Sequence, residues 1–168
     1  MDKITGKHEV QFQRVAGRLH RVVPILDAAG KVIQYAISPL KVELRRRDLL
    51  QILVGSSVLA VPIAFTEETW RLGVSLPLGN VMVLAGLSIA FISAYVYFNF
   101  YREMIRQHLS DYFKRVVAIY LLSLIVVAAL LTIIEVAPWR EDFLLALKRT
   151  IIVGFPSSMS AAVSDAID

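Results

Sequence analysis

The sequence predicts an all-α membrane protein, a bundle of four membrane-spanning helices that follows a short cytoplasmic leader. First, 57% of the 168 residues are hydrophobic and the mean hydropathy is +0.62, more than a soluble domain of this length shows. Second, the apolar residues gather into long runs with short charged segments between them. Such runs are typical of helices that cross a lipid bilayer.

The chain divides into a leader, residues 1–47, and a transmembrane domain, residues 48–168. The first twenty residues have no apolar core, so we expect no cleavable signal peptide. Residues 22–37 hold two β-prone runs around the turn sequence "DAAGK", which predicts a β-hairpin. Because a lone hairpin is marginally stable in water, it would pack on a copy of itself, on the bundle or on a partner.

Four spans are predicted, at about 49–70, 76–101, 114–136 and 143–165. The apolar run of the first span, Leu49 to Phe65, would be about 26 Å long as a helix, just enough to cross the hydrocarbon core. The fourth contains Gly154, Pro156 and several serines, so it is poorly suited to face lipid. We expect it in the bundle interior, where protein or water covers polar backbone, and a surface amphipathic segment is the alternative.

Lysine and arginine are more frequent on one side of the predicted spans, which predicts a cytoplasmic amino terminus and, with four spans, a cytoplasmic carboxyl terminus. This excess also accounts for the net charge of +4 without nucleic-acid binding. On the cytoplasmic side lie Lys41, Arg45, Arg46, Arg47, Arg102, Arg106, Lys114 and Arg115, and on the other side Arg71, Arg140, Lys148 and Arg149.

Small and polar residues follow one face of two predicted spans and end in acids. In a homo-oligomer, such faces are candidates for a cation pathway, with an acidic ring at its mouth. The alternative is that these stripes are packing seams between helices and that the acids are ordinary interfacial charges. The predicted pathway residues are Ser56, Ala60, Ala64, Glu67 and Glu68 in the first span and Ser157, Ser160, Ser164 and Asp165 in the fourth.

The adjacent acids Glu67 and Glu68 raise a question of charge at the end of the first span. If that helix continues to Trp70, both carboxylates lie in its last turn, where the helix dipole disfavours each by about 0.3–1 kcal/mol. Arg71 or a bound metal ion would compensate for this cost, and the sequence leaves the metal undetermined. Pro62 adds a kink within the same span.

The leading functional hypothesis is a homo-oligomeric cation channel or passive cation transporter, because four short spans leave little interior for a pathway through one copy. A second hypothesis is a non-conducting scaffold or regulatory subunit that binds a partner or anionic lipid through Lys41, Arg45, Arg46 and Arg47. A third is an exchanger that cycles protons through Asp165 or Glu68.

Enzymatic chemistry finds little support in the sequence. The chain has no cysteine, and its histidines, His8, His20 and His108, lack metal-ligand spacing. It contains no "HExxH", no glycine-rich phosphate loop and no "GxSxG". We therefore expect neither an enzyme nor a cofactor.

The stretch "VELRRRDLLQILVGSSVLAVPIAFTEETW", residues 42–70, resembles a family of small uncharacterised prokaryotic integral membrane proteins, classified as a domain of unknown function. The resemblance rests on the "RRRD" entry and on the pattern "PxxFTEExW", and the later spans are similar in hydropathy. It implies a multi-pass protein of a prokaryotic inner membrane, and it supplies no catalytic or binding residue.

Overall fold

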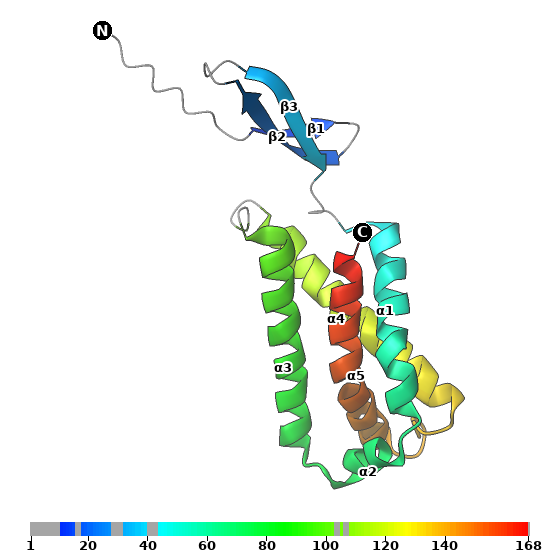
Figure 1. The fold of residues 1–168 in the computed structure, drawn as a ribbon. Coiled ribbons are helices and arrows are strands. Elements are labelled where there is room, and N and C mark those ends of the chain that lie inside the picture. Colours follow the sequence, from blue (N-terminus) through cyan, green and yellow to red (C-terminus); the bar gives the residue numbers. More distant parts are fainter. Residues whose placement is uncertain are drawn as a thin grey trace. The chain divides into compact units, whose positions relative to one another are not determined.

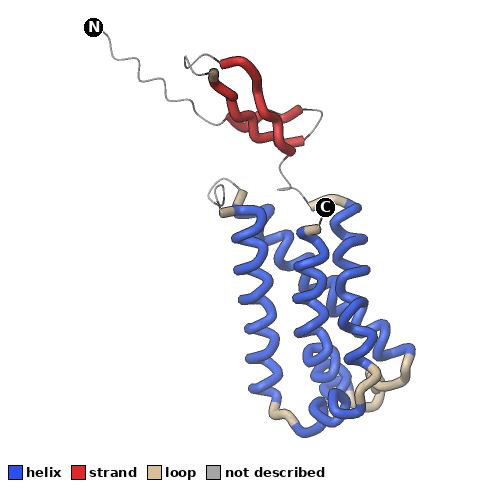
Figure 2. Tube along the Cα trace, viewed as in Figure 1, coloured by secondary structure: helices blue, strands red, loops and turns tan. Residues whose placement is uncertain are grey.

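The computed structural model describes residues 11–15, 18–27, 32–39, 44–102, 105 and 108–167. They belong to two compact units, Met1–Glu43 and Leu44–Asp168. The described part of the first unit is built of strands and that of the second of helices (Figure 2).

The first unit is a three-stranded antiparallel sheet of β1 (Gln11–Val15), β2 (Arg18–Leu26) and β3 (Val32–Pro39) in that order (Figure 1). Strands β2 and β3 pair with Val22 opposite Ile37, and the register shifts between Ile25 and Leu26. This pairing confirms the hairpin predicted within residues 22–37. Strand β1, which pairs with β2, was not predicted, and it turns the hairpin into a sheet.

The second unit consists of helices. Three of them are long and apolar enough to cross a membrane: α1 (Arg46–Ala64), α3 (Leu78–Val96) together with its π-helical continuation η1 (Tyr97–Tyr101), and α4 (Leu109–Ile133). The short helix α2 (Glu67–Ser75) follows α1, and α5 (Phe143–Ala166) closes the chain. Helix α5 is not among the three candidate spans.

The first helix ends earlier than predicted, at Ala64 instead of Trp70, and α2 begins as a separate helix at Glu67. Pro62 has no N–H to donate, and its ring crowds the carbonyl one turn earlier, so the last turn of α1 is weakened. Two side chains donate hydrogen bonds to backbone carbonyls that have no partner within the helix at this end. Thr66 Oγ1 donates to Ile63 O across 2.7 Å, and Trp70 Nε1 donates to Ala64 O across 2.6 Å.

Helix α5 packs against α1, α2, α3 and α4, and it runs between α1 and α3 in Figure 1. Eleven of its 24 residues are buried, against six of 19 in α1 and six of 25 in α4. Helix α5 is thus the interior helix of this unit, as its serines, glycine and proline led us to expect.

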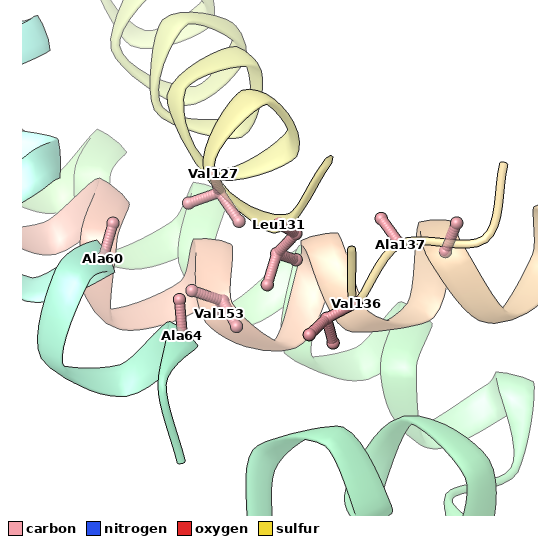
Figure 3. Packing of buried hydrophobic residues seen from close by; sticks show 8 residues of the cluster. Ala60, Ala64, Val127, Leu131, Val136, Ala137 and Val153 are labelled. Atoms are coloured by element: carbon pink, nitrogen blue, oxygen red, sulfur yellow. The ribbon is translucent and has the colours of Figure 1, made fainter. Parts of the chain in front are cut away.

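A hydrophobic core lies between α1, α4 and α5, toward the end where α2 lies (Figures 1 and 3). Its members are mostly small, which allows the three helices to approach closely. The cluster contains Ala60, Ala64, Val127, Leu131, Val136, Ala137, Ala146 and Val153.

Candidate functional site

The small-residue stripe of α1 lies in the seam with α5. Ser56, Ala60 and Ala64 are fully buried. Beside them, a Cβ added at Gly55 would overlap the Ser164 side chain and lie 3.1 Å from Ala161 Cα, so only glycine permits this approach. Within one copy of the chain, the stripe therefore packs against another helix.

The predicted serines of α5 divide into two groups. Ser157 is fully buried, and its Oγ donates to Val153 O across 2.7 Å, while Ser160 and Ser164 are half-buried. In the same way, Ser56 Oγ donates to Leu53 O across 2.9 Å. A hydroxyl that binds its own helix needs no water, which explains how these residues are accommodated in an apolar interior.

Glu67 and Glu68 are exposed and lie in the first turn of α2. Our expectation that they occupy the last turn of a helix was wrong, because the helix breaks before them. The amino-terminal end of a helix favours carboxylates, so no compensating cation is required. The fold also separates these acids from Asp165, because they follow the carboxyl end of α1 whereas Asp165 lies near its amino end (Figure 1).

Of the basic residues predicted to contact lipid or a partner, Arg46 and Arg47 are exposed at the start of α1, and Arg45 is half-buried before it. Lys41 lies outside the described residues. The backbone N–H of Arg45 donates to Asp48 Oδ2 across 3.0 Å, which places Asp48 as an acid in the first turn of α1.

A buried ionic cluster joins three helices at the amino end of α1. Arg115 Nη1 donates to Asp165 Oδ2 across 2.9 Å, and Arg115 Nη2 donates to Asp48 Oδ2 across 3.0 Å. Arg115 and Asp165 are both 0% exposed. The three residues come from the first turn of α1, the second turn of α4 and the last turn of α5.

Aromatic residues of η1 complete the surroundings of Arg115. The Arg115 Cζ atom lies 4.2 Å from the centre of the Phe100 ring, a cation–π contact, and the fully buried Tyr101 hydroxyl interacts with the same side chain. Tyr101 in turn meets Tyr112 of α4 edge to face, with ring centroids 5.5 Å apart. A π turn is uncommon, and here its residues bring two successive side chains to the cluster.

Sequence reasoning identified Asp165 as polar lining but missed its partners. It assigned Arg115 to the basic flank of the third span, although the side chain is buried. The signal was the position of a single arginine next to the apolar run from Val116, together with acids at the start of one helix and the end of another. Separations of 67 and 50 residues leave no periodicity that would pair them.

The cluster brings the carboxylates of Asp48 and Asp165 to the guanidinium of Arg115. Charges in an apolar interior lose their hydration, so they are retained only when paired and hydrogen-bonded. Chemically, the arrangement fastens helix ends together, and it also offers an acid that a proton or another cation can compete for. Among the described residues, no group of three histidines, cysteines or acids could hold a metal ion.

Arg149 organises the opposite end of the unit. Its Nη1 donates to Val136 O across 2.6 Å and its Nε donates to Trp70 O across 3.2 Å. A Cβ on Gly73 would lie 2.5 Å from Arg149 Cγ, so the arginine stem packs directly on α2. Arg149 thereby connects α5 to both α2 and the segment after α4.

A cavity of about 250 Å³ opens between α3 and α5. Its lining offers no carboxylate to a cation, so it does not extend the ionic cluster into a polar path. It is lined by Phe91, Ile92, Tyr95, Met159, Ala162 and Val163.

Long apolar helices packed around a central, partly polar helix with buried charges define an integral membrane protein of the α-helical class. The chain belongs to the family described as "Putative integral membrane protein (DUF2391)", whose model matches residues 28–167. The match extends from β3 to the end of α5 and confirms the resemblance drawn from residues 42–70. No curated protein and no solved structure matches the chain.

Proposed function

We propose that this chain is a cation-translocating protein of a prokaryotic inner membrane, that it works as a homo-oligomer, and that Asp165 is the acid which the cation meets. One observation carries the proposal: Arg115 and Asp165 form an ion pair with no exposed surface among helices suited to a membrane. Ionisable groups in such surroundings are costly, and they commonly mark ion or proton pathways.

In this proposal α5 is the fourth span. Its 24 residues would extend about 36 Å, longer than the hydrocarbon core of about 30 Å. Its charged residues support this placement, because Lys148 and Arg149 lie near one end and Asp165 near the other. With the amino terminus in the cytoplasm, the ionic cluster closes the cytoplasmic end of the bundle.

The two carboxylates give Arg115 a partner at every stage. When a cation occupies Asp165, the guanidinium keeps its hydrogen bond to Asp48, so it is not left as an uncompensated charge. When the cation leaves, Asp165 returns to Arg115 Nη1. Asp48 is thus the fixed partner and Asp165 the exchangeable one.

Oligomerisation remains part of the proposal, because the stripe of Ser56, Ala60 and Ala64 is filled by α5 and provides no open path within one copy. The exposed Glu67 and Glu68 form the outer acidic site that concentrates cations.

The test is cation flux in liposomes that contain the purified protein at matched density. We expect wild-type flux above protein-free controls and at least a tenfold decrease for Asp165→Asn. Glu141→Gln, which neutralises an exposed acid just before α5, is the matched control and should keep its flux. Flux equal to protein-free liposomes for several cations and for protons contradicts the proposal.

A second candidate function, a non-conducting scaffold or regulatory subunit, is favoured by the sheet of the first unit. Ile33 and Tyr35 share one face of β3 by the two-residue alternation of a strand, and they are 64% and 58% exposed. Two large apolar side chains exposed on one face of a small sheet form a surface that a partner could cover.

The two candidates separate by variants of the full chain. An adaptor should lose its partner with Ile33→Glu and Tyr35→Glu together and be indifferent to Asp165→Asn. The control is Gln34→Glu, which adds the same charge on the opposite face of β3 and should leave binding intact.

A further inference from the structure

We propose that the cavity between α3 and α5 is a groove that binds one acyl chain of an anionic phospholipid, with the lipid headgroup near Arg102. This site goes beyond the proposed function, because it takes a lipid and lies on a part of the unit that the cation does not use. Three features of the molecule support it: the shape of the groove, its place on a membrane helix, and the charge at the end toward which it extends.

The groove has a buried floor and an exposed rim. Ile92 and Ala162 form the floor, and both are buried. Phe91 and Val163 lie at the rim and are 48% and 46% exposed, so the cavity of about 250 Å³ opens on the outer surface of the helices. Ordered water requires polar partners, whereas an apolar cavity smaller than this one accepts benzene. The volume and lining therefore suit a short length of hydrocarbon chain.

Two aromatic rings bound one end of the groove. Phe91 of α3 and Phe155 of α5 lie with their ring centroids 6.4 Å apart. The next lining residues follow one helical turn later in each helix, Tyr95 in α3 and Met159 in α5. Both helices run away from the end of the unit where α2 lies (Figure 1). The groove thus extends from the aromatic pair toward the carboxyl ends of α3 and α5.

The surface around the groove belongs to a helix suited to face lipid. Helix α3 is one of the three candidate spans, and most of its apolar window is exposed. A second copy of the chain is a poorer occupant than a lipid, because helices pack by ridges of side chains that fit grooves over several turns. Here the lining covers about one turn of each helix, from Phe91 to Tyr95 and from Met159 to Val163. A narrow, flexible acyl chain fits so short a groove.

The groove extends toward the basic end of the unit. Arg102 directly follows η1 and is exposed, about 10 Å beyond Tyr95 along the helix axis. Arg46 and Arg47 at the start of α1 and Lys114 in α4 are exposed at the same end. Basic residues beside a span attract anionic headgroups. A phospholipid whose phosphate lies near Arg102 can therefore place one acyl chain in the groove.

Native mass spectrometry of the purified full chain in detergent tests the groove with two lipids that have identical acyl chains. One is phosphatidylglycerol, which is anionic, and the other is phosphatidylcholine, which is zwitterionic. We expect the wild type to retain one phosphatidylglycerol more tightly than phosphatidylcholine. Val163→Phe fills the rim of the groove and should weaken the binding of both lipids severalfold. The matched control is Val83→Phe, at an exposed position of α3 outside the groove, and it should bind lipid as the wild type does.

The headgroup contact is tested in the same titration. Arg102→Gln should reduce the preference for phosphatidylglycerol over phosphatidylcholine by about fivefold, the effect of one basic residue at a membrane surface. Arg71→Gln is the control, because this arginine is exposed in α2 at the other end of the unit, and it should leave the preference unchanged.

A second measurement leaves the groove open. The chain has no cysteine, so Val163→Cys and Val83→Cys each introduce a single thiol. We expect phosphatidylglycerol to slow alkylation of the thiol at position 163 by a small apolar maleimide more than phosphatidylcholine does. At position 83 the two lipids should have equal effects. This comparison decides the question even if Val163→Phe fails to fold.

Four results would overturn the proposal: equal affinity of the wild type for the two lipids, lipid binding that Val163→Phe leaves unchanged, equal loss of binding in Val163→Phe and Val83→Phe, and equal protection of the two thiols. A disulfide-linked dimer that forms on oxidation of Val163→Cys and not of Val83→Cys would also overturn it, because a second copy would then occupy the groove. None of these measurements uses an ion gradient, so they are independent of whether the protein translocates cations.

Discussion

Arg115 and Asp165 meet across 2.9 Å although 50 residues separate them in the chain, and neither is exposed. Asp48 Oδ2 accepts a hydrogen bond from the other terminal nitrogen of the same guanidinium, across 3.0 Å. One arginine thus holds the amino end of α1, the second turn of α4 and the carboxyl end of α5. Such a contact specifies how the helix ends are arranged.

Removing the guanidinium should destabilise the protein strongly. Arg115→Leu takes the guanidinium away from two buried carboxylates, so we expect a loss of about 3–5 kcal/mol in the free energy of unfolding. Arg115→Lys keeps the charge but cannot reach both acids with a rigid fork, so its cost should be smaller. Denaturant titration in detergent measures both.

Removing the two acids together with the arginine separates the effect of charge from the effect of packing. Adding Asp48→Asn and Asp165→Asn to Arg115→Leu removes the two negative charges that lost the guanidinium, and it should restore a large part of the lost stability. If the triple variant is no more stable than Arg115→Leu alone, packing of the arginine, not its charge, is what the cluster contributes.

Close packing of α1 on α5 predicts a selective effect at one glycine. Gly55→Ala would place a methyl group onto the Ser164 side chain and against the α5 backbone, so the helices must separate, at about 1–3 kcal/mol. Gly86→Ala is the control, since nothing lies within 4 Å of a Cβ there, and the better helix propensity of alanine should leave stability unchanged or slightly raised. Equal melting temperatures for the two variants would contradict the seam.

Hydropathy and local turn chemistry predicted a large part of this fold. Long apolar runs gave the three candidate spans, and "DAAGK" between β-prone runs gave the pairing of β2 with β3. The serines and Pro156 of α5 indicated an interior helix. These features depend on residues near one another in the chain, and so a single sequence reveals them.

The features that sequence reasoning missed depend on three-dimensional contacts. The break after Ala64 is stabilised by Thr66 and Trp70, whose bonds to the end of α1 have no hydropathy signal. Arg115 looks like any basic residue beside a span until α1 and α5 bring their acids to it. The candidate site was therefore predictable only at Asp165.

Backbone strain at Glu135 predicts that a substitution there can stabilise the protein. This residue has φ +60°, in the left-handed region, directly after α4. Its N–H donates to Thr132 O across 3.1 Å, and the next N–H, that of Val136, donates to Leu131 O across 2.9 Å, a Schellman arrangement that favours glycine. We expect Glu135→Gly to stabilise the protein by about 1 kcal/mol.

The measurement is the midpoint of denaturation in detergent. Glu141→Gly removes the same side chain at an exposed position without left-handed backbone, and there glycine adds only freedom to the unfolded chain. A gain for both variants, or for neither, would show that backbone strain at Glu135 is not the cause.

Arg149 should control how firmly α2 is attached. Arg149→Met retains the apolar stem against Gly73 but removes the donors to Trp70 O and Val136 O, so two carbonyls lose their partner. We expect a cost of about 1–3 kcal/mol and faster amide hydrogen exchange across Glu67–Ser75, with little change in the last turns of α5 near Asp165. Arg71→Met is the matched control, because this arginine belongs to α2 itself and is exposed. Unchanged hydrogen exchange in α2 with Arg149→Met would mean that packing alone holds this helix. Faster exchange in α2 with Arg71→Met would mean that charge at this end of the bundle, and not the hydrogen bonds of Arg149, sets the exchange rate.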